Sequence, residues 1–362
     1  MATLRLFLDL GDCFTKAIAI GAPGRWRLRF PSVVAHRLST AAIPASDLVL
    51  GEPEVVPRHH DFDATRFPRS RSYPDAEILA QSASPVARPR FAGWLAAAYG
   101  ADRELLGKHP SDENVDALLN KALLPCAAGH DRAELTFVVD LGPKVAPVLR
   151  QAARSPRPIE LAAWRVGAQT PSHIRLDVSM SVVDAPACAR AALPPEIVPA
   201  DGPLLLVDIG YLRTKLAILS PVGCEHHEEV HGVGVAACVA RILRDGQAQD
   251  LVEDELAIVR ALERSTDFIE VQGRRFDVRE TLQAVQREVA LDIAREALRL
   301  IRDHYGLRGD ACRAVAILGG GAVLLGRGVA DGILDGGLGV QAPWIVPDPN
   351  PLLVEGASKI VR

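Results

Sequence analysis

One short pattern occurs twice in this chain of 362 residues, and it constrains the fold more than any other feature. The two copies are Asp9 to Lys16 (DLGDCFTK) and Asp208 to Lys215 (DIGYLRTK), and every matched position is 199 residues apart. Short apolar runs flank the turn of each copy, which is typical of two β-strands joined as a hairpin. A period this long excludes a solenoid and predicts two related domains, each opening with the same hairpin.

The length supports two domains, because single cores stop growing at about 250–300 residues. A Pro-rich stretch from Leu193 to Pro203, directly before the second copy, reads as a linker. The formal net charge of −4 and the ordinary share of charged residues exclude general disorder and a strongly basic nucleic-acid coat.

Each copy of the pattern carries the groups that bind phosphate. An Asp at a strand end can hold hydrated Mg²⁺, and a turn Gly lets backbone N–H groups approach anionic oxygens. Thr adds a hydroxyl, and Lys adds a point charge. Lysine is scarce here, with six residues against 35 arginines, yet Lys16 and Lys215 occupy matched positions. The spacing is neither a P-loop nor a dinucleotide fingerprint. Either motif alone also suits an ordinary hairpin whose turn favours Asp and Gly.

Other segments complete a coarse secondary structure. Residues 22–75 read as irregular, and 76–126 show helical patterning. Further strands are expected at 135–142, 161–167, 174–184 and 314–318, and helices at 145–153, 235–245, 252–264 and 278–305. The strand at 314–318 runs directly into Gly319-Gly320-Gly321-Ala322, with a helix expected next.

In their order and spacing these segments resemble the actin superfamily of ATPases. The two hairpins resemble its two phosphate motifs, residues 314–329 its adenosine motif, and 346–360 (VPDPNPLLVEGASKI) its closing segment. Residues 30–35 (FPSVVA) resemble the ParM-type branch of bacterial and archaeal actin-like proteins. The resemblance implies an α/β fold with two related domains, duplicated RNase H-like cores, around a nucleotide cleft. It places domain I at 1–198, with an insertion at about 31–130 and closed by 340–362, and domain II at 199–339, with a helical insertion at about 232–310.

The resemblance also implies roles for single residues. Asp9 and Asp208 would orient Mg²⁺ through water. The β- and γ-phosphates would be met by Gly11, Asp12, Thr15 and Lys16 from one side and by Gly210, Tyr211, Leu212 and Thr214 from the other. The adenosine would lie against Gly319, Gly320, Gly321 and Ala322. Many relatives have Gly, Ser or Thr at the second turn, so the bulk of Tyr211 puts the hydrolysis rate in question.

Two further carboxylates have two interpretations each. Asp184, in the stretch 181–187 (SVVDAPA), matches the group that positions the attacking water, and a helix cap or turn role is its alternative. Glu255, in the helix expected at 252–264, is the candidate for ribose and base contact, and a solvated helix face explains it equally.

The function implied by the resemblance is an ATPase that binds ATP or ADP with Mg²⁺ and polymerises with copies of itself. Plasmid or other DNA segregation, another cytoskeletal role and an adaptor protein are compatible with this interpretation. The alternatives are a small-molecule kinase of the same superfold and a non-polymerising nucleotide-binding scaffold. No direct nucleic-acid or membrane partner is expected. Six scattered cysteines without a C-x-x-C pair indicate reduced thiols and the cytoplasm.

Two clusters remain open. Cys224 to His231 (CEHHEEVH) has metal-capable residues at short spacing, although its place after the second hairpin also suits a surface strand. The Arg-rich segment from Arg58 to Pro74 lies where this fold carries a subunit-contacting loop, and a solvated loop is the alternative. Interleaved aspartates argue against DNA binding there.

Overall fold

The computed structural model separates two compact units, residues 1–188 with 353–362 (unit 1) and residues 189–352 (unit 2). Each unit is described by itself. The structure describes residues 3–21, 24–35, 77–82, 91–93, 96, 103–107, 112–123, 126–127, 130–139, 157–165, 172–199, 202–244, 258–259, 262, 268–271, 274–306, 312, 314–337 and 343–361.

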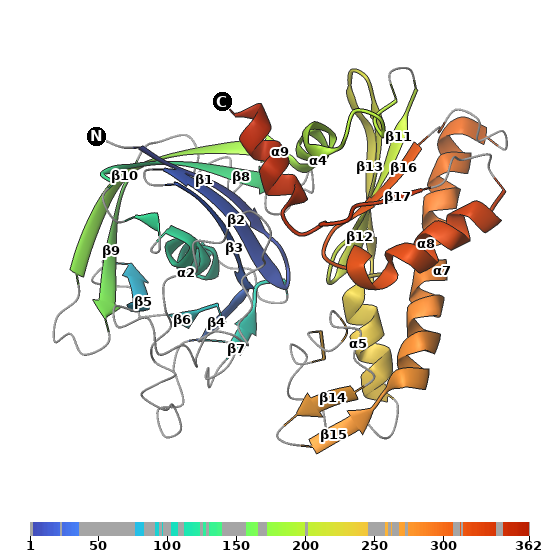
Figure 1. Ribbon diagram of the computed structural model, residues 1–362, viewed down its shortest axis with the longest axis horizontal. Coiled ribbons are helices and arrows are strands. Elements are labelled where there is room, and N and C mark those ends of the chain that lie inside the picture. Colours follow the sequence, from blue (N-terminus) through green and yellow to red (C-terminus); the bar gives the residue numbers. More distant parts are fainter. Residues whose placement is uncertain are drawn as a thin grey trace. The chain divides into compact units, whose positions relative to one another are not determined.

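Unit 1 is built on a seven-stranded sheet in the order β3-β2-β1-β8-β10-β9-β5 (Figure 1). The strands are β1 (Thr3–Leu10), β2 (Phe14–Gly21), β3 (Gly24–Pro31), β5 (Glu77–Ser82), β8 (Arg132–Val139), β9 (Arg157–Arg165) and β10 (Ser172–Asp184). β1, β8 and β10 run parallel, and β2 is antiparallel to both of its neighbours. Apolar side chains of β1 and β2, among them Leu6, Leu8 and Ile18, form the fully buried centre, so both strands are apolar in nearly every position.

Helices and a small sheet complete the described part of unit 1. The sheet has the order β6-β4-β7, and these elements are β4 (Val33–Ala35), β6 (Phe91–Ala92), β7 (Arg103–Leu105), α2 (Asp112–Leu123), α4 (Ala185–Ala192) and α9 (Leu352–Ile360). In α9, Gly356 lies directly on the backbone of Cys188 in α4, and Glu355 forms an ion pair with Arg27 of β3. The chain passes from unit 1 to unit 2 within α4 and returns at the start of α9. The first crossing therefore comes before the Pro-rich stretch that was expected to be the linker.

Unit 2 is built on a five-stranded sheet in the order β13-β12-β11-β16-β17. Its elements are β11 (Leu204–Ile209), β12 (Arg213–Ser220), β13 (Gly223–His231), α5 (Val235–Arg244), the β14 (Phe268–Val271) and β15 (Arg274–Asp277) hairpin, α7 (Arg279–Tyr305), β16 (Ala314–Leu318), α8 (Ala322–Asp335) and β17 (Trp344–Ile345). α8 packs against α7 and crosses it in the view of Figure 1, and Gly328 and Gly332 of α8 allow a close approach.

The two units repeat one arrangement of strands. In each, an antiparallel hairpin is followed by a third antiparallel strand on one side and by parallel strands on the other. Asp9 lies opposite Lys16, and Asp208 lies opposite Lys215, so the registers of the two hairpins are also equivalent. The predicted fold class, two related α/β domains opening with the same hairpin, is confirmed.

Most of the expected elements are present. The strands predicted in the second half of unit 1 correspond to β8, β9 and β10, and the strand at 314–318 is β16. The helices expected near Val235 and Val278 are α5 and α7, and α7 ends at Gly306, whose φ is 71°. Residues 193–199, 202 and 203 form neither helix nor strand, as expected of the Pro-rich stretch.

Two expectations about unit 1 are wrong. Residues 24–35 are not irregular but form β3 and β4, because Trp26, Leu28 and Phe30 point into the core and arginines alternate with them. Residues 76–126 are helical only in part, since 77–82, 91–92 and 103–105 are short strands paired with β9 and β4. The segment 58–74 and the helix expected at 145–153 lie outside the described residues, as does most of the helix at 252–264.

No helix in the described parts of the chain combines the length and the apolar character needed to cross a lipid bilayer.

Candidate functional site

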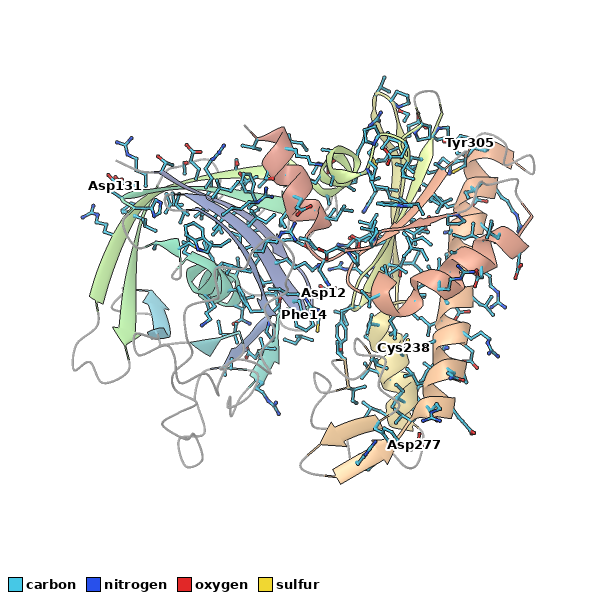
Figure 2. All side chains as sticks on the ribbon, in the orientation of Figure 1. Asp12, Phe14, Asp131, Cys238, Asp277 and Tyr305 are labelled. Carbon is cyan, nitrogen blue, oxygen red and sulfur yellow. The ribbon has the colours of Figure 1, made fainter. Side chains whose placement is uncertain are left out.

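The first hairpin brings Asp9 and Lys16 together at the carboxyl end of β1. Lys16 Nζ donates a hydrogen bond to Asp9 Oδ2 over 3.1 Å, and both side chains are mostly buried, with 14 % and 16 % exposed. The turn between them is tight, because a Cβ at Gly11 would lie 2.7 Å from the Phe14 carbonyl oxygen. Figure 2 shows Asp12 and Phe14 together at this turn. The first hairpin thus ends in a compact turn with one cation and one carboxylate behind it.

Thr15 stabilises this turn from inside the protein. Its residue is fully buried, and its Oγ1 lies 3.0 Å from Ser32 Oγ. Ser32 Oγ in turn donates to the Gly11 carbonyl oxygen over 2.6 Å. The Thr15 hydroxyl is therefore hydrogen-bonded inside the protein, and its contact with phosphate stays a prediction.

Asp184 lies at the same edge of the sheet as Asp9. Asp184 pairs in register with Val139 of β8, and Asp9 pairs with the adjacent Val138. The pKa of the Cys188 thiol is raised to about 12, mainly by burial and also by the negative charges of Asp184 and Asp9. Both carboxylates therefore act on the first turn of α4. The structure brings these two predicted residues together, with Asp184 directly before α4.

The second hairpin repeats the geometry of the first. Asp208 lies opposite Lys215, and a Cβ at Gly210 would lie 2.8 Å from the Arg213 carbonyl oxygen. Thr214, which matches Thr15, is 1 % exposed, and its Oγ1 donates to the Val233 carbonyl oxygen over 2.6 Å. Both repeat threonines are therefore internal hydrogen-bonding groups, although their partners differ.

The tip of the second hairpin is tied to the start of α5. The carbonyl oxygens of residues 210, 211 and 212 accept hydrogen bonds from the N–H groups of residues 235, 236 and 232, over 3.2, 2.8 and 3.2 Å. Gly234 makes this approach feasible, because a Cβ there would lie 2.7 Å from the Tyr211 oxygen. The Tyr211 residue is buried, and Leu212 is half-buried. The turn therefore buries Tyr211 and holds the backbone of residues 210–212 against the start of α5.

A glycine loop lies next to Asp208. Gly319 ends β16 with a φ of 86°, and a side chain there would overlap the Asp208 carboxylate and the Ile209 backbone. The N–H of Gly321 donates to the Ile209 carbonyl oxygen over 2.8 Å, which holds the loop on β11. Ala322 begins α8 and is buried. Asp208 and the predicted Gly319–Ala322 segment are thus adjacent.

The sequence analysis missed Asn350. A Cβ at Gly320 would lie 3.4 Å from Asn350 Oδ1, and this amide side chain is buried. The available signal was its place within the closing segment, between two prolines. Of the predicted residues, only Glu255 lies outside the described part of the chain.

The residues in place suit a nucleotide and Mg²⁺. Hydrated Mg²⁺ takes oxygen ligands from one or two carboxylates, and each unit has an Asp at a strand end, Asp9 in unit 1 and Asp208 in unit 2. The loop from Gly319 to Gly321 packs against Asp208 and Ile209 of β11, which brings glycine backbone beside that carboxylate.

The Cys224–His231 segment is β13, a strand paired on one side with β12. The ring of His226 lies 4.2 Å, between centroids, from that of His304 in α7. Within the described residues, no group of three or more His, Cys, Asp or Glu side chains is placed to hold a metal ion. The surface-strand interpretation of this cluster is confirmed.

Comparison with known proteins gives a fold rather than a close relative. No protein-family model matches the chain, and no curated protein matches it in sequence. A 15-stranded ParM filament from Clostridium botulinum matches with a TM-score of 0.66 at 13 % identity over 98 % of both chains. The actin-like protein Alp7A matches at 0.66 and 12 % identity, over 99 % of this chain and 96 % of that one. The archaeal actin homologue Ta0583 with ADP matches at 0.65 and 16 % identity, over 98 % and 97 %. This chain has the actin-like fold of ParM and of other bacterial and archaeal actin homologues.

Proposed function

We propose that this protein is an actin-like ATPase that binds ATP with Mg²⁺ and assembles into filaments with copies of itself. The observation that carries the proposal is the duplicated hairpin, in which an Asp, a turn Gly and a Lys occupy equivalent registers in both units. The glycine loop beside Asp208 supports an adenine nucleotide, because it stands where the adenosine motif was expected, and a similar chain has been solved with ADP.

The two turns would hold the phosphates with their backbone. The tight turns at Gly11 and Gly210 would offer the N–H groups of Asp12, Tyr211 and Leu212 to anionic oxygens. Lys16 adds a positive charge that Asp9 already positions. Thr15 and Thr214 keep the turns in shape from within, so they act as positioning residues in this proposal.

Mg²⁺ would be held through water by Asp9 and Asp208, and when bound it neutralises charge on the phosphates. Asp184 would orient the water that attacks the terminal phosphorus, which yields ADP and phosphate. Its place at the carboxyl edge of the sheet, one register position beyond that of Asp9, supports this role. Positioning and charge stabilisation are most of what phosphoryl transfer requires.

Self-assembly is supported by the fold that this chain shares with a ParM filament subunit over nearly its whole length. A head-to-tail contact that does not close into a ring produces such a filament. A role in plasmid segregation, an adaptor protein and a cytoplasmic location stay predictions from the sequence resemblance, as do the domain limits.

The assembly proposal is tested by sedimentation and electron microscopy of the purified chain with ATP and Mg²⁺, with a non-hydrolysable ATP analogue, and without nucleotide. We expect filaments with both nucleotides and none without. Nucleotide binding without polymer across salt and pH would instead favour a scaffold, and ATP turnover stimulated by a sugar would favour a kinase.

The assignment of Asp184 is tested by phosphate release under the same conditions. Asp184→Asn should lower the rate at least about tenfold while nucleotide affinity stays within about twofold. Asp177→Asn is the matched control, because it makes the same change at an exposed position of the same strand. Equal rates for the two variants would remove Asp184 from the proposal.

A further inference from the structure

Three successive carbonyl groups at the tip of the first hairpin are held inside the protein. The Gly11 oxygen accepts a hydrogen bond from Ser32 Oγ over 2.6 Å, and the Cys13 oxygen accepts one from the Ser32 N–H over 2.8 Å. The Asp12 oxygen between them accepts a hydrogen bond from the Gly107 N–H over 3.1 Å. Ser32 is fully buried between β3 and β4, and Gly107 comes shortly after β7. The tip is therefore held by the segments that carry the small sheet β6-β4-β7.

The second hairpin holds the matching carbonyls in the same way. The oxygens of residues 210, 211 and 212 accept hydrogen bonds from N–H groups at the start of α5 and just before it. Ser32 and Gly232 are matched positions, because each directly follows the residue that pairs with the start of its hairpin's second strand. Both donate their N–H to the third carbonyl. The first carbonyl has different donors, the Val235 N–H in unit 2 and the Ser32 hydroxyl in unit 1.

The held carbonyls determine where the neighbouring N–H groups point. In a planar trans peptide, a C=O group and the N–H of the next residue point in opposite directions. The first two held carbonyls of unit 1 therefore turn the N–H groups of Asp12 and Cys13 to the other side of the turn. The N–H groups of Tyr211 and Leu212 are turned in the same way in unit 2. Successive N–H groups on one side of a turn make an anion-binding surface, and both units build it on one pattern.

The Ser32 hydroxyl stands in the middle of a short chain of hydrogen bonds. A serine hydroxyl has one proton to donate, and here it goes to the Gly11 oxygen. The oxygen of Ser32 therefore accepts the proton of the Thr15 hydroxyl, which lies 3.0 Å away. Removing the Ser32 hydroxyl would take this donor from the first carbonyl, and the peptide that carries the Asp12 N–H would lose its fixed orientation.

We propose that Ser32 is a positioning residue for phosphate binding, which turns the peptide between Gly11 and Asp12 so that its N–H meets the polyphosphate of a nucleotide. This inference rests on the proposed nucleotide binding. Ser32 supports the turn from behind and does not contact the ligand itself. The matching carbonyl of unit 2 is held by backbone, so a substitution at Ser32 changes the first turn and leaves the second one intact.

The test is the affinity of the full-length chain for ATP with Mg²⁺ and for adenosine, each measured by competition with a fluorescent ADP derivative. Ser32→Ala should weaken ATP binding about fivefold, the effect of about one hydrogen bond. Adenosine binding should stay unchanged, because the glycine loop expected to contact adenosine lies in unit 2.

Ser220→Ala is the matched control. It removes another buried serine hydroxyl, which donates to the Gly223 carbonyl oxygen over 3.4 Å at the end of β12 opposite the turn. This variant should bind ATP like the unmodified chain.

Two further measurements follow the same chain of hydrogen bonds. Thr15→Val keeps the size of the side chain and removes the hydroxyl that donates to Ser32, so we expect ATP affinity to fall about twofold. Hydrogen exchange at residues 103–107 reports on the turn, because the Gly107 N–H donates to the Asp12 carbonyl. ATP should slow this exchange in the unmodified chain and in Ser220→Ala, and slow it less in Ser32→Ala.

The outcomes separate this inference from the proposed function. If the unmodified chain binds no nucleotide, the proposed function itself fails. If it binds ATP and Ser32→Ala binds ATP equally well, or loses ATP and adenosine to the same extent, Ser32 does not position the turn for phosphate. Thermal unfolding identifies a variant that loses its fold. Should Ser32→Ala unfold, full ATP affinity in Thr15→Val together with no effect of ATP on exchange at 103–107 in the unmodified chain would overturn the inference.

Discussion

Two glycines of unit 2 differ in how strictly their positions exclude a side chain. Gly319 combines a left-handed φ of 86° with direct contact on the Asp208 carboxylate. Gly337 has a similar φ of 68°, but no other atom lies within 4 Å of where its Cβ would be. This pair separates the cost of backbone strain from the cost of a collision.

Replacing Gly319 by Ala should lower the free energy of unfolding by about 2–5 kcal/mol, because about 1–2 kcal/mol of strain adds to an overlap of about 1–3 kcal/mol. Gly337→Ala should cost only the strain, about 1–2 kcal/mol. Urea unfolding of both variants measures the difference. Equal losses would show that the loop next to Asp208 is not closely packed.

Buried thiols make unit 2 less stable as the pH becomes alkaline. Burial raises the pKa of Cys238 in α5 from 9.0 to about 12, while nearby Arg241 lowers it by a smaller amount. The folded chain therefore holds this proton more tightly than the unfolded chain. The resulting stability is complete below about pH 9 and is lost as the pH rises through the folded value.

We expect the free energy of unfolding to fall between pH 9 and 11, with each such thiol contributing up to about 1.4 kcal/mol per pH unit. Cys238→Ala should reduce this slope, and Cys224→Ala, at a half-buried thiol, should not. Urea unfolding at several pH values measures the slopes. If both variants keep the original slope, Cys238 does not titrate with unfolding.

The residues of the site could be predicted from the sequence only where the repeat marked them. Asp9 and Asp208 stand at strand ends because the same pattern surrounds both. The burial of Thr15 could not be predicted, because its hydroxyl forms a hydrogen bond with Ser32, which lies in another segment of the chain. The pairing of Arg29 with Lys16 could not be predicted for the same reason, because it depends on the register of β3.

At the scale of elements, the packing of α8 on α7 depends on a stripe of small residues. Gly328, Gly332 and Gly336 lie four residues apart on α8, and they face Ala290, Ala294 and Leu298, which have the same spacing on α7. A Cβ at Gly332 would lie 2.8 Å from the Cβ of Ala294. The helices therefore approach at a distance that larger residues exclude.

Replacing Gly332 by Leu should lower the free energy of unfolding by about 1–3 kcal/mol, since the added side chain overpacks this crossing. Arg327→Leu puts the same side chain on the same helix at a position where the side chain is 85 % exposed. Its effect should stay within about 0.5 kcal/mol. Thermal unfolding of both variants tests the packing, and similar melting temperatures would contradict it.

Elements with a strong period were predictable, and short ones were not. α7 shows apolar residues at three- and four-residue steps over its whole length, and β16 is a pure apolar run. β3 also alternates, with apolar residues on one face and arginines on the other. These arginines, and the glycine at the start of the strand, made β3 difficult to recognise from the sequence. β6 and β7 are too short for any period, and they exist because β4 offers both edges for pairing.

On the scale of the whole molecule, α9 belongs to the unit that begins the chain. Deleting residues 353–362 should therefore loosen unit 1, because it removes the Arg27–Glu355 ion pair and the contact of Gly356 with Cys188. Hydrogen exchange should increase at β3 and α4, and β11 and β12 should keep their protection. Faster exchange confined to β11 and β12 would contradict this division of the chain.

The path of the chain through α4 and α9 makes unit 2 a nested domain. It is one uninterrupted stretch, 189–352, and the residues on either side of it meet where Gly356 rests on Cys188. Both strands of the connection therefore leave unit 1 from a single spot. A short glycine-rich bridge from residue 188 to residue 353 could excise the inner domain without stretching the outer one. Unit 2 could be exchanged or duplicated in evolution in the same way, as one continuous insertion that is attached to unit 1 at a single place.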